Sequence, residues 1–268
     1  MGPPVRVRFR YAKQGKIRFT SQRDVARMWE RALRRSGLPV AWSEGFSPRP
    51  LLSFGLALPT GAESLGEYVD VRLAPGPGPP DPAADLRREV LDALGRGGRD
   101  LAALLGPLMP EGITVQASAL VDHATGSLQQ EVTSCDWEME VHGVAPRELT
   151  ARVERLLGSP SVVVRRERKG RPVEDDLRPG VRTLAVVADG TGSSTGGQAR
   201  CRLRAELATR PRGVRPGELL EVLGAGVVLD RACRTHQWIE RDGERREPLS
   251  MGGELPEASG HPARERAS

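Results

Sequence analysis

The chain opens with alternating apolar and basic residues. Val5, Val7, Phe9 and Tyr11 stand at every second position, and arginines occupy positions 6, 8 and 10 between them. A period of two is typical of a β-strand whose opposite faces meet different surroundings. The pattern therefore predicts a first strand with one buried apolar face and one basic face.

A helical pattern follows at about residues 23–36. Ser21 with Asp24 three residues later has the form of a capping box, and Gly37 fits the end of a helix. The apolar residues of this segment recur at intervals of three and four, which predicts one buried helix face. These residues are Val25, Met28, Trp29, Ala32 and Leu33.

The remaining patterns predict a repeated architecture. The segments LPVAW, LLSFGLALP, EYVDVRLA and ITVQASALV favour strands, with a further helix at about residues 83–105. The second half repeats this order with VTSCDWEMEVHG as a strand, PRELTARVERLLG as a helix, a hairpin turning at Lys169-Gly170, two more strands, a helix over residues 215–223 and a weak strand near GVVLD. We predict an α+β protein of two ferredoxin-like halves of the βαββαβ type, with antiparallel sheets.

The boundaries follow from composition. The first half is expected at residues 1–121 and the second at residues 131–240. Residues 241–268 contain few apolar side chains, which predicts a disordered C-terminal tail.

The charge of the chain is unevenly distributed. Residues 1–60 contain 12 Lys or Arg and 3 Asp or Glu, a balance of +9, whereas the whole chain carries +5. The other 208 residues therefore sum to −4. This asymmetry indicates that the N-terminal half meets an anionic partner.

Compartment signals are few. No run approaches the roughly 18 apolar residues of a membrane span, so we expect no membrane partner. The basic N-terminus lacks the apolar core of a secretion signal. Cys135, Cys201 and Cys233 are too scattered to form a disulfide framework, and a cytoplasmic location is expected.

No complete catalytic constellation is present. The three cysteines are 66 and 32 residues apart, which does not provide the local motif of an iron–sulfur cluster. Cys233 and His236 make only half of a structural zinc site. We therefore expect no catalytic residues, no metal site and no cofactor.

Anion binding is the chemistry that the N-terminal half favours. Arginine pairs with phosphate and stacks on bases, a helix N-terminus offers free N–H groups, and prolines hold the SEGFSPRP loop extended. The expected phosphate contacts are Lys13, Lys16, Arg18, Arg23, Arg27 and Arg49, with Ser21 at the helix start and Gln22 and Ser47 contacting sugar or base. We expect the loop of residues 45–50 to lie near the N-terminus of the first helix.

Residues 5–50, followed by LSFGLALPTGAES and EYVDV, resemble the radical-SAM-linked family of uncharacterised proteins. In that family the domain is fused to, or encoded beside, a radical SAM protein. The resemblance implies such a protein as partner, extends to about residue 240 and is most specific over residues 5–72. Gln22 and Ser47 stand where many members of the family have histidine.

The function expected from these observations is a non-catalytic accessory module that binds RNA or another anionic substrate. Two alternatives remain open. One is a metal-independent endoribonuclease of ferredoxin-like repeat architecture using Tyr11, Lys13 or Lys16, although no histidine precedes His123. The other is a protein-interaction scaffold without RNA affinity.

Overall fold

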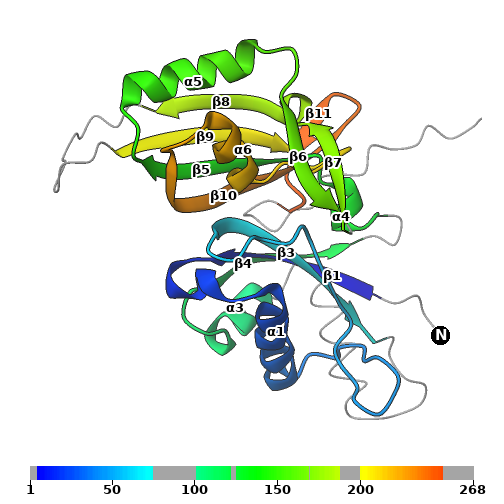
Figure 1. Ribbon diagram of the computed structural model, residues 1–268. Helices are drawn as coiled ribbons and strands as arrows, with labels where there is room; N and C mark the ends of the chain where they lie inside the picture. The colour runs from blue at the N-terminus through cyan, green and yellow to red at the C-terminus, as the bar shows by residue number, and fades with distance from the viewer. Residues whose placement is uncertain (1–4, 75–100, 122–124, 169, 188–199, 250–268) are drawn as a thin grey trace, which may run out of the picture.

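A computed structural model describes residues 5–74, 101–121, 125–168, 170–187 and 200–249 (Figure 1). The first half of the chain forms a sheet covered on one face by helices. Its strands are β1 (Val5–Lys13), β2 (Leu52–Phe54), β3 (Glu63–Leu73) and β4 (Ile113–Val121). Its helical segments are η1 (Gly15–Phe19), α1 (Gln22–Ser36), α3 (Leu101–Leu105) and η2 (Gly106–Leu108).

The second half repeats the pattern and adds a hairpin. Its strands are β5 (Ser134–His142), β6 (Val163–Arg168), β7 (Arg171–Asp176), β8 (Val181–Val187), β9 (Arg200–Ala208), β10 (Val228–Arg241) and β11 (Glu244–Arg246). Its helical segments are α4 (Leu128–Glu131), α5 (Pro146–Gly158), η3 (Arg178–Gly180) and α6 (Pro216–Leu223). The β6–β7 hairpin forms a separate two-stranded sheet.

One sheet runs through both halves in the order β4-β1-β3-β10-β5-β9-β8. Along this path every neighbouring pair is antiparallel except β3–β10. That parallel contact is short, with Cys233 opposite Glu63 and Arg234 opposite Ser64. The molecule is therefore a mixed α+β structure with a large, mostly antiparallel sheet, which confirms the predicted class and sheet type.

Strand order repeats between the halves. β2 pairs with β3 beyond the β10 contact, so the first half reads β4-β1-β3-β2. The second half reads β10-β5-β9-β8. In the first half, β1 therefore lies between β4 and β3, and β2 lies at the edge. In the second half, β5 lies between β10 and β9, and β8 lies at the edge.

Two main cores form because each half buries the apolar face of its strands against its own helices. In the first half, α1 and α3 lie against one face of the sheet (Figure 1), and Trp29 of α1 makes aromatic contacts with Phe9 and Tyr11 of β1. In the second half Met139, Leu149 and Leu219 join β5, α5 and α6. The helices α1 and α3, and α5 and α6, cover one face of the sheet in each half, and in the first half the short helix α4 and the segment ending at Leu249 lie on the opposite face.

Most of the predicted elements are confirmed. The strand at residues 5–13, the helix ending at Gly37 and the strand ITVQASALV lie where the patterns indicated. LPVAW forms only isolated bridges, Val40 with Leu73 and Trp42 with Pro50, instead of a strand. Of the helix expected at 83–105, only residues 101–105 fall within the described residues, and they are helical.

The C-terminal boundary is corrected by the structure. The weak strand near GVVLD is the start of the 14-residue strand β10, which is followed by β11. Leu249 is fully buried. The predicted disorder is therefore wrong for residues 241–249, because these residues pack onto the sheet. Residues 250–268 lie outside the described residues.

Candidate functional site

The start of α1 is organised by Ser21. Its hydroxyl accepts the Asp24 amide at 3.2 Å and donates to Oδ2 of Asp24 at 2.7 Å. The hydrogen bond from Ser21 and the neighbouring Arg27, whose Nη1 lies 3.2 Å from Oδ1, lower the pKa of Asp24. Asp24 is therefore ionised near neutral pH. The negative charge of Asp24 offsets the positive charge of Arg27. Ser21 and Arg27 therefore both have a partner, Asp24, in the first turn of α1.

Two other predicted cations point to solvent. Lys16 and Arg23 are exposed, and no carboxylate within the described ranges lies at ion-pair distance from either of them. Gln22, between them, is half-buried. We call Lys16, Arg18, Gln22 and Arg23 the helix-start surface.

Phe19 adds an aromatic ring to this surface. Its side chain is 63% exposed and belongs to none of the hydrophobic clusters of the described residues. The guanidinium of Arg18 lies over the ring at 4.8 Å and also sits 3.6 Å from the buried carboxylate of Glu63. A cation and a ring therefore stack in the same η1 turn that carries the exposed Lys16.

Lys13 has a structural position. It is buried, and its ammonium group donates to the carbonyl oxygens of Arg18 (3.2 Å) and Thr20 (3.0 Å). Burial lowers its pKa, although Glu67 opposes this effect. Lys13 holds the η1 turn in place and is not part of the exposed surface.

The loop carrying Ser47 and Arg49 lies elsewhere than predicted. Arg34, near the end of α1, stacks over Trp42 at 4.6 Å and donates to the carbonyl of Pro48. Arg34 lies 13 positions after Ser21 along the helix, a rise of about 20 Å. Ser47 and Arg49 are exposed, but the prediction that their loop borders the helix N-terminus is wrong because Arg34 holds the loop at the opposite end.

The predicted basic face of the first strand is also corrected. Arg8 is 1% exposed and makes a two-pronged contact with Asp70, with Nε–Oδ1 at 2.7 Å and Nη2–Oδ2 at 3.0 Å. Arg10 donates to Glu247 at 3.1 Å. These arginines face away from the helices but are covered by the chain around residues 247–249, so they are not available to an anion.

A groove opens between the halves and was not predicted. Its volume is about 510 Å³, and the segment Pro59–Ala62, the first turns of α6 and the start of β10 line it. Arg18 and Phe19 form its rim on the first half. Because the groove combines residues about 200 positions apart in the sequence, only the folded chain reveals it.

Beneath the groove, Glu63 connects three segments. It accepts hydrogen bonds from the Gly15 amide (2.9 Å) and from Arg231 in β10 (Nε, 2.8 Å). Burial alone would raise the pKa of Glu63, but the bonds from Arg231 and Gly15 lower it below its ordinary value. The two arginines beside it, Arg18 and Arg231, are thus fixed in position at the edge of the groove.

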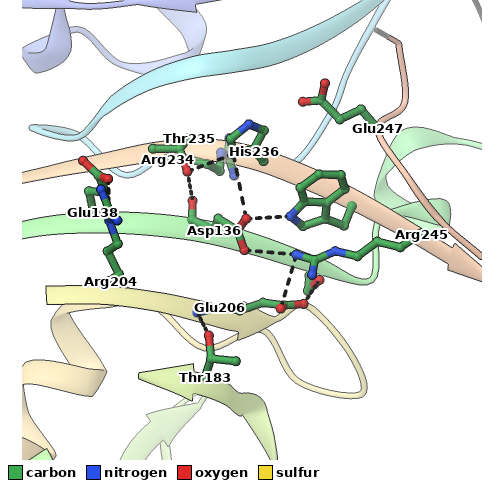
Figure 2. A network of polar contacts seen from close by, with 12 residues as sticks. Asp136, Glu138, Thr183, Arg204, Glu206, Arg234, Thr235, His236, Arg245 and Glu247 are labelled. Atoms are coloured by element: carbon green, nitrogen blue, oxygen red, sulfur yellow. Dashed lines mark hydrogen bonds and ion pairs between the residues drawn. The ribbon is translucent and has the colours of Figure 1, made fainter. Parts of the chain in front are cut away.

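The helix-free face of the second half is a polar network (Figure 2). Asp136 accepts from Trp238 Nε1 at 2.8 Å and from Arg245 at 3.3 Å, and Arg245 also lies 3.2 Å from Glu206. His236 stacks on Trp238 with ring centroids 5.2 Å apart. Because Arg245 of this network is paired with carboxylates, this face has less unpaired positive charge for an anion than the helix-start surface.

The described ranges show no cluster that would hold a metal. No group of three His, Cys, Asp or Glu side chains comes together among them. The thiol of Cys233 has its pKa raised to about 11, chiefly by burial.

Among the residues that the structure describes, no helix has both the length and the apolar composition needed to cross a bilayer.

Comparison with known proteins identifies the family. A solved structure described as a Cbf5-Nop10-Gar1 complex shares 13% identity with the chain at a TM-score of 0.40; the match covers 85% of this chain and 49% of that one. No curated protein matches. A family model described as "Uncharacterized protein conserved in bacteria (DUF2344)" matches residues 6–94 and 98–216. The chain therefore belongs to this family of uncharacterised bacterial proteins.

Proposed function

We propose that the protein is a non-catalytic accessory module that binds RNA through the helix-start surface. The observation that carries this proposal is the exposure of Lys16 and Arg23, without carboxylate partners in the described chain, beside the exposed ring of Phe19. Single-stranded RNA is bound by such a combination, because cations contact phosphates while rings stack on bases.

The alternative of an endoribonuclease is less well supported. Tyr11 is 2% exposed, and burial raises its pKa well above the ordinary value, so its hydroxyl stays protonated and out of reach of substrate. Acid–base catalysis by Lys16 would need a second group, and no carboxylate of the described residues lies at ion-pair distance from it. Incubation with structured RNA in EDTA tests this point, and site-specific cleavage lost in Lys16→Ala would favour the enzyme.

Each half is proposed to be a ferredoxin-like unit. The support is the strand order, β4-β1-β3-β2 and β10-β5-β9-β8, with a helix following the first strand of each set. The β6–β7 hairpin is then an insertion between the helix and the second strand. The proposed partner is a radical SAM protein, for which the support is the resemblance of residues 5–72.

The direct test is RNA binding at several salt concentrations. Three phosphate contacts, from Lys16, Arg18 and Arg23, predict a log–log slope of about −2 for single-stranded RNA. The double variant Lys16→Ala/Arg23→Ala should flatten this slope by about 1.4. Fluorescence anisotropy with a labelled single strand measures both quantities.

A matched control lies on α5. Arg147 and Arg155 are exposed and have no ion pair among the described residues. Their double alanine variant removes the same charge and should leave RNA binding almost unchanged. The proposal would be contradicted if both double variants lose the same RNA affinity, or if the RNA affinity of the wild type does not depend on salt. Co-purification with and without nuclease distinguishes an RNA-mediated partner from a direct protein contact.

A further inference from the structure

The groove between the halves has an unpaired strand edge as one wall. β10 pairs with β5 along one edge from Val228 onward, but with β3 only at Cys233 and Arg234. N-terminal to Cys233, no described strand pairs with the second edge. There the segment Pro59–Ala62 and the start of β10 separate, and the groove lies between them.

An unpaired edge is a template for another strand. Its N–H and C=O groups remain available to an extended segment that enters beside it. Leu229, Asp230, Arg231 and Ala232 all line the groove. At about 3.3 Å per residue this edge can accommodate roughly four residues of a bound segment. The register of β10 against β5 shifts between Leu229 and Arg231, as bulged strands do beside functional sites.

The apolar lining fits a side-chain anchor. Phe19 is 63% and Leu229 is 38% exposed, and Pro59, Ala62, Pro216 and Ala232 complete the apolar walls. A volume of about 510 Å³ lies within the range of about 300–1,000 Å³ in which proteins bind compact ligands. One or two apolar side chains of an extended segment would cover the exposed rings and methyl groups.

Charge separates a peptide from a nucleic acid. The lining contains three arginines (Arg18, Arg215, Arg231) and three carboxylates (Glu218, Glu221, Asp230). Glu218 is engaged by Arg212 at 2.6 Å and Asp230 by His142 at 2.9 Å, so Arg215 and Glu221 remain without an ion pair in the described chain. A polyanion gains little from such a neutral groove, whereas a peptide with side chains of both signs complements it.

We propose that this groove binds an extended peptide segment of a partner protein by strand addition to β10, with an apolar side chain of the peptide packed between Phe19 and Leu229. This role is independent of RNA binding. The groove and the helix-start surface share Arg18 and Phe19 at their common rim, but Thr60, Leu229 and the β10 edge belong to the groove alone.

The experiment uses the full chain and a displayed library of random peptides of about nine residues. Peptides are selected on wild type and counter-selected on Thr60→Trp, which fills the groove from an exposed position. Selected peptides should bind wild type, bind Phe19→Ala or Leu229→Ala about tenfold more weakly, and bind Lys16→Ala/Arg23→Ala normally. Thermal melts confirm that each variant folds.

Strand addition gives two further signatures. N-methylation of the peptide should abolish binding at every second position, because alternate amides face β10. Hydrogen exchange should show slower exchange in residues 228–232 when peptide is bound. The proposal would be overturned if the selected peptides bind Thr60→Trp with the same affinity as wild type, or if N-methylation at every position leaves binding intact. A library that yields no groove-dependent peptide would overturn it too. Strong protection in the free chain of those amides of residues 228–232 that point away from β5 would also contradict it, since another part of the chain would then occupy the edge.

Discussion

At the scale of single residues, the most informative contact is the buried pair Glu67–Arg234, which joins β3 to β10. Arg234 is 2% exposed, and its Nε and Nη2 lie 2.9 Å and 2.6 Å from Oε1 of Glu67. Removing one partner from such a pair leaves an uncompensated buried charge. We expect Glu67→Ala to lower the free energy of unfolding by about 3–5 kcal/mol, measured by urea denaturation.

The control for this prediction is the double variant Glu67→Leu/Arg234→Met, which removes both charges together. It should be more stable than Glu67→Leu alone, because no charge is left buried without a partner. If the single and double variants lose the same stability, the pair contributes through side-chain packing and the electrostatic explanation is wrong.

Glu63 gives a prediction about pH. Its pKa is lower in the folded chain than in the unfolded one, so its contribution to stability is present above the unfolded value and is lost as pH falls through the folded value. Stability should therefore decline below about pH 5, and Glu63→Gln should make this decline shallower. Urea midpoints between about pH 3 and 7 measure the effect. An unchanged acid limb in Glu63→Gln would contradict it.

At the scale of elements, the segment 247–249 and the short helix α4 cover the face of the first half that lies opposite α1 and α3. Glu247 accepts from Arg10 at 3.1 Å and from the Tyr68 hydroxyl at 3.4 Å, and Leu249 is fully buried in a cluster with Tyr68, Ala117 and Leu128. Leu249→Ala should cost about 2–5 kcal/mol of unfolding free energy, as buried leucines do. Leu65→Ala, at a 37% exposed position, should cost far less by the same urea titration. If Leu249→Ala lowers the free energy of unfolding as little as Leu65→Ala does, this segment does not stabilise the sheet.

The elements also show what the sequence could reveal. β1, α1, β4 and α5 follow patterns of period two or 3.6 that local packing imposes, and the structure bears them out. β10 was underestimated because register shifts interrupt its alternation and one of its faces is polar. The burial of Arg8 and Arg10 was not predictable, since their partners Asp70 and Glu247 are 62 and 237 residues away.

At the scale of the whole molecule, the halves have separate cores but share buried polar contacts. The β3–β10 pairing is short, yet Gln237 donates to the Gly66 carbonyl at 2.7 Å and the Ser64 hydroxyl to the Arg234 carbonyl at 3.2 Å, next to the Glu67–Arg234 pair. Unfolding of one half would leave these groups of the other half unpaired.

We therefore expect the two halves to unfold in one transition. Trp29 lies in the core of the first half and Trp137 in that of the second. The indole N–H signals of both in NMR spectra should disappear at the same urea concentration, and the calorimetric and van't Hoff enthalpies should agree. Weakening the junction with Glu67→Ala should move both midpoints together, because both halves depend on that pair. Two separated midpoints, or a shift confined to one tryptophan, would show that each half is an independent folding unit and that the junction adds little to stability.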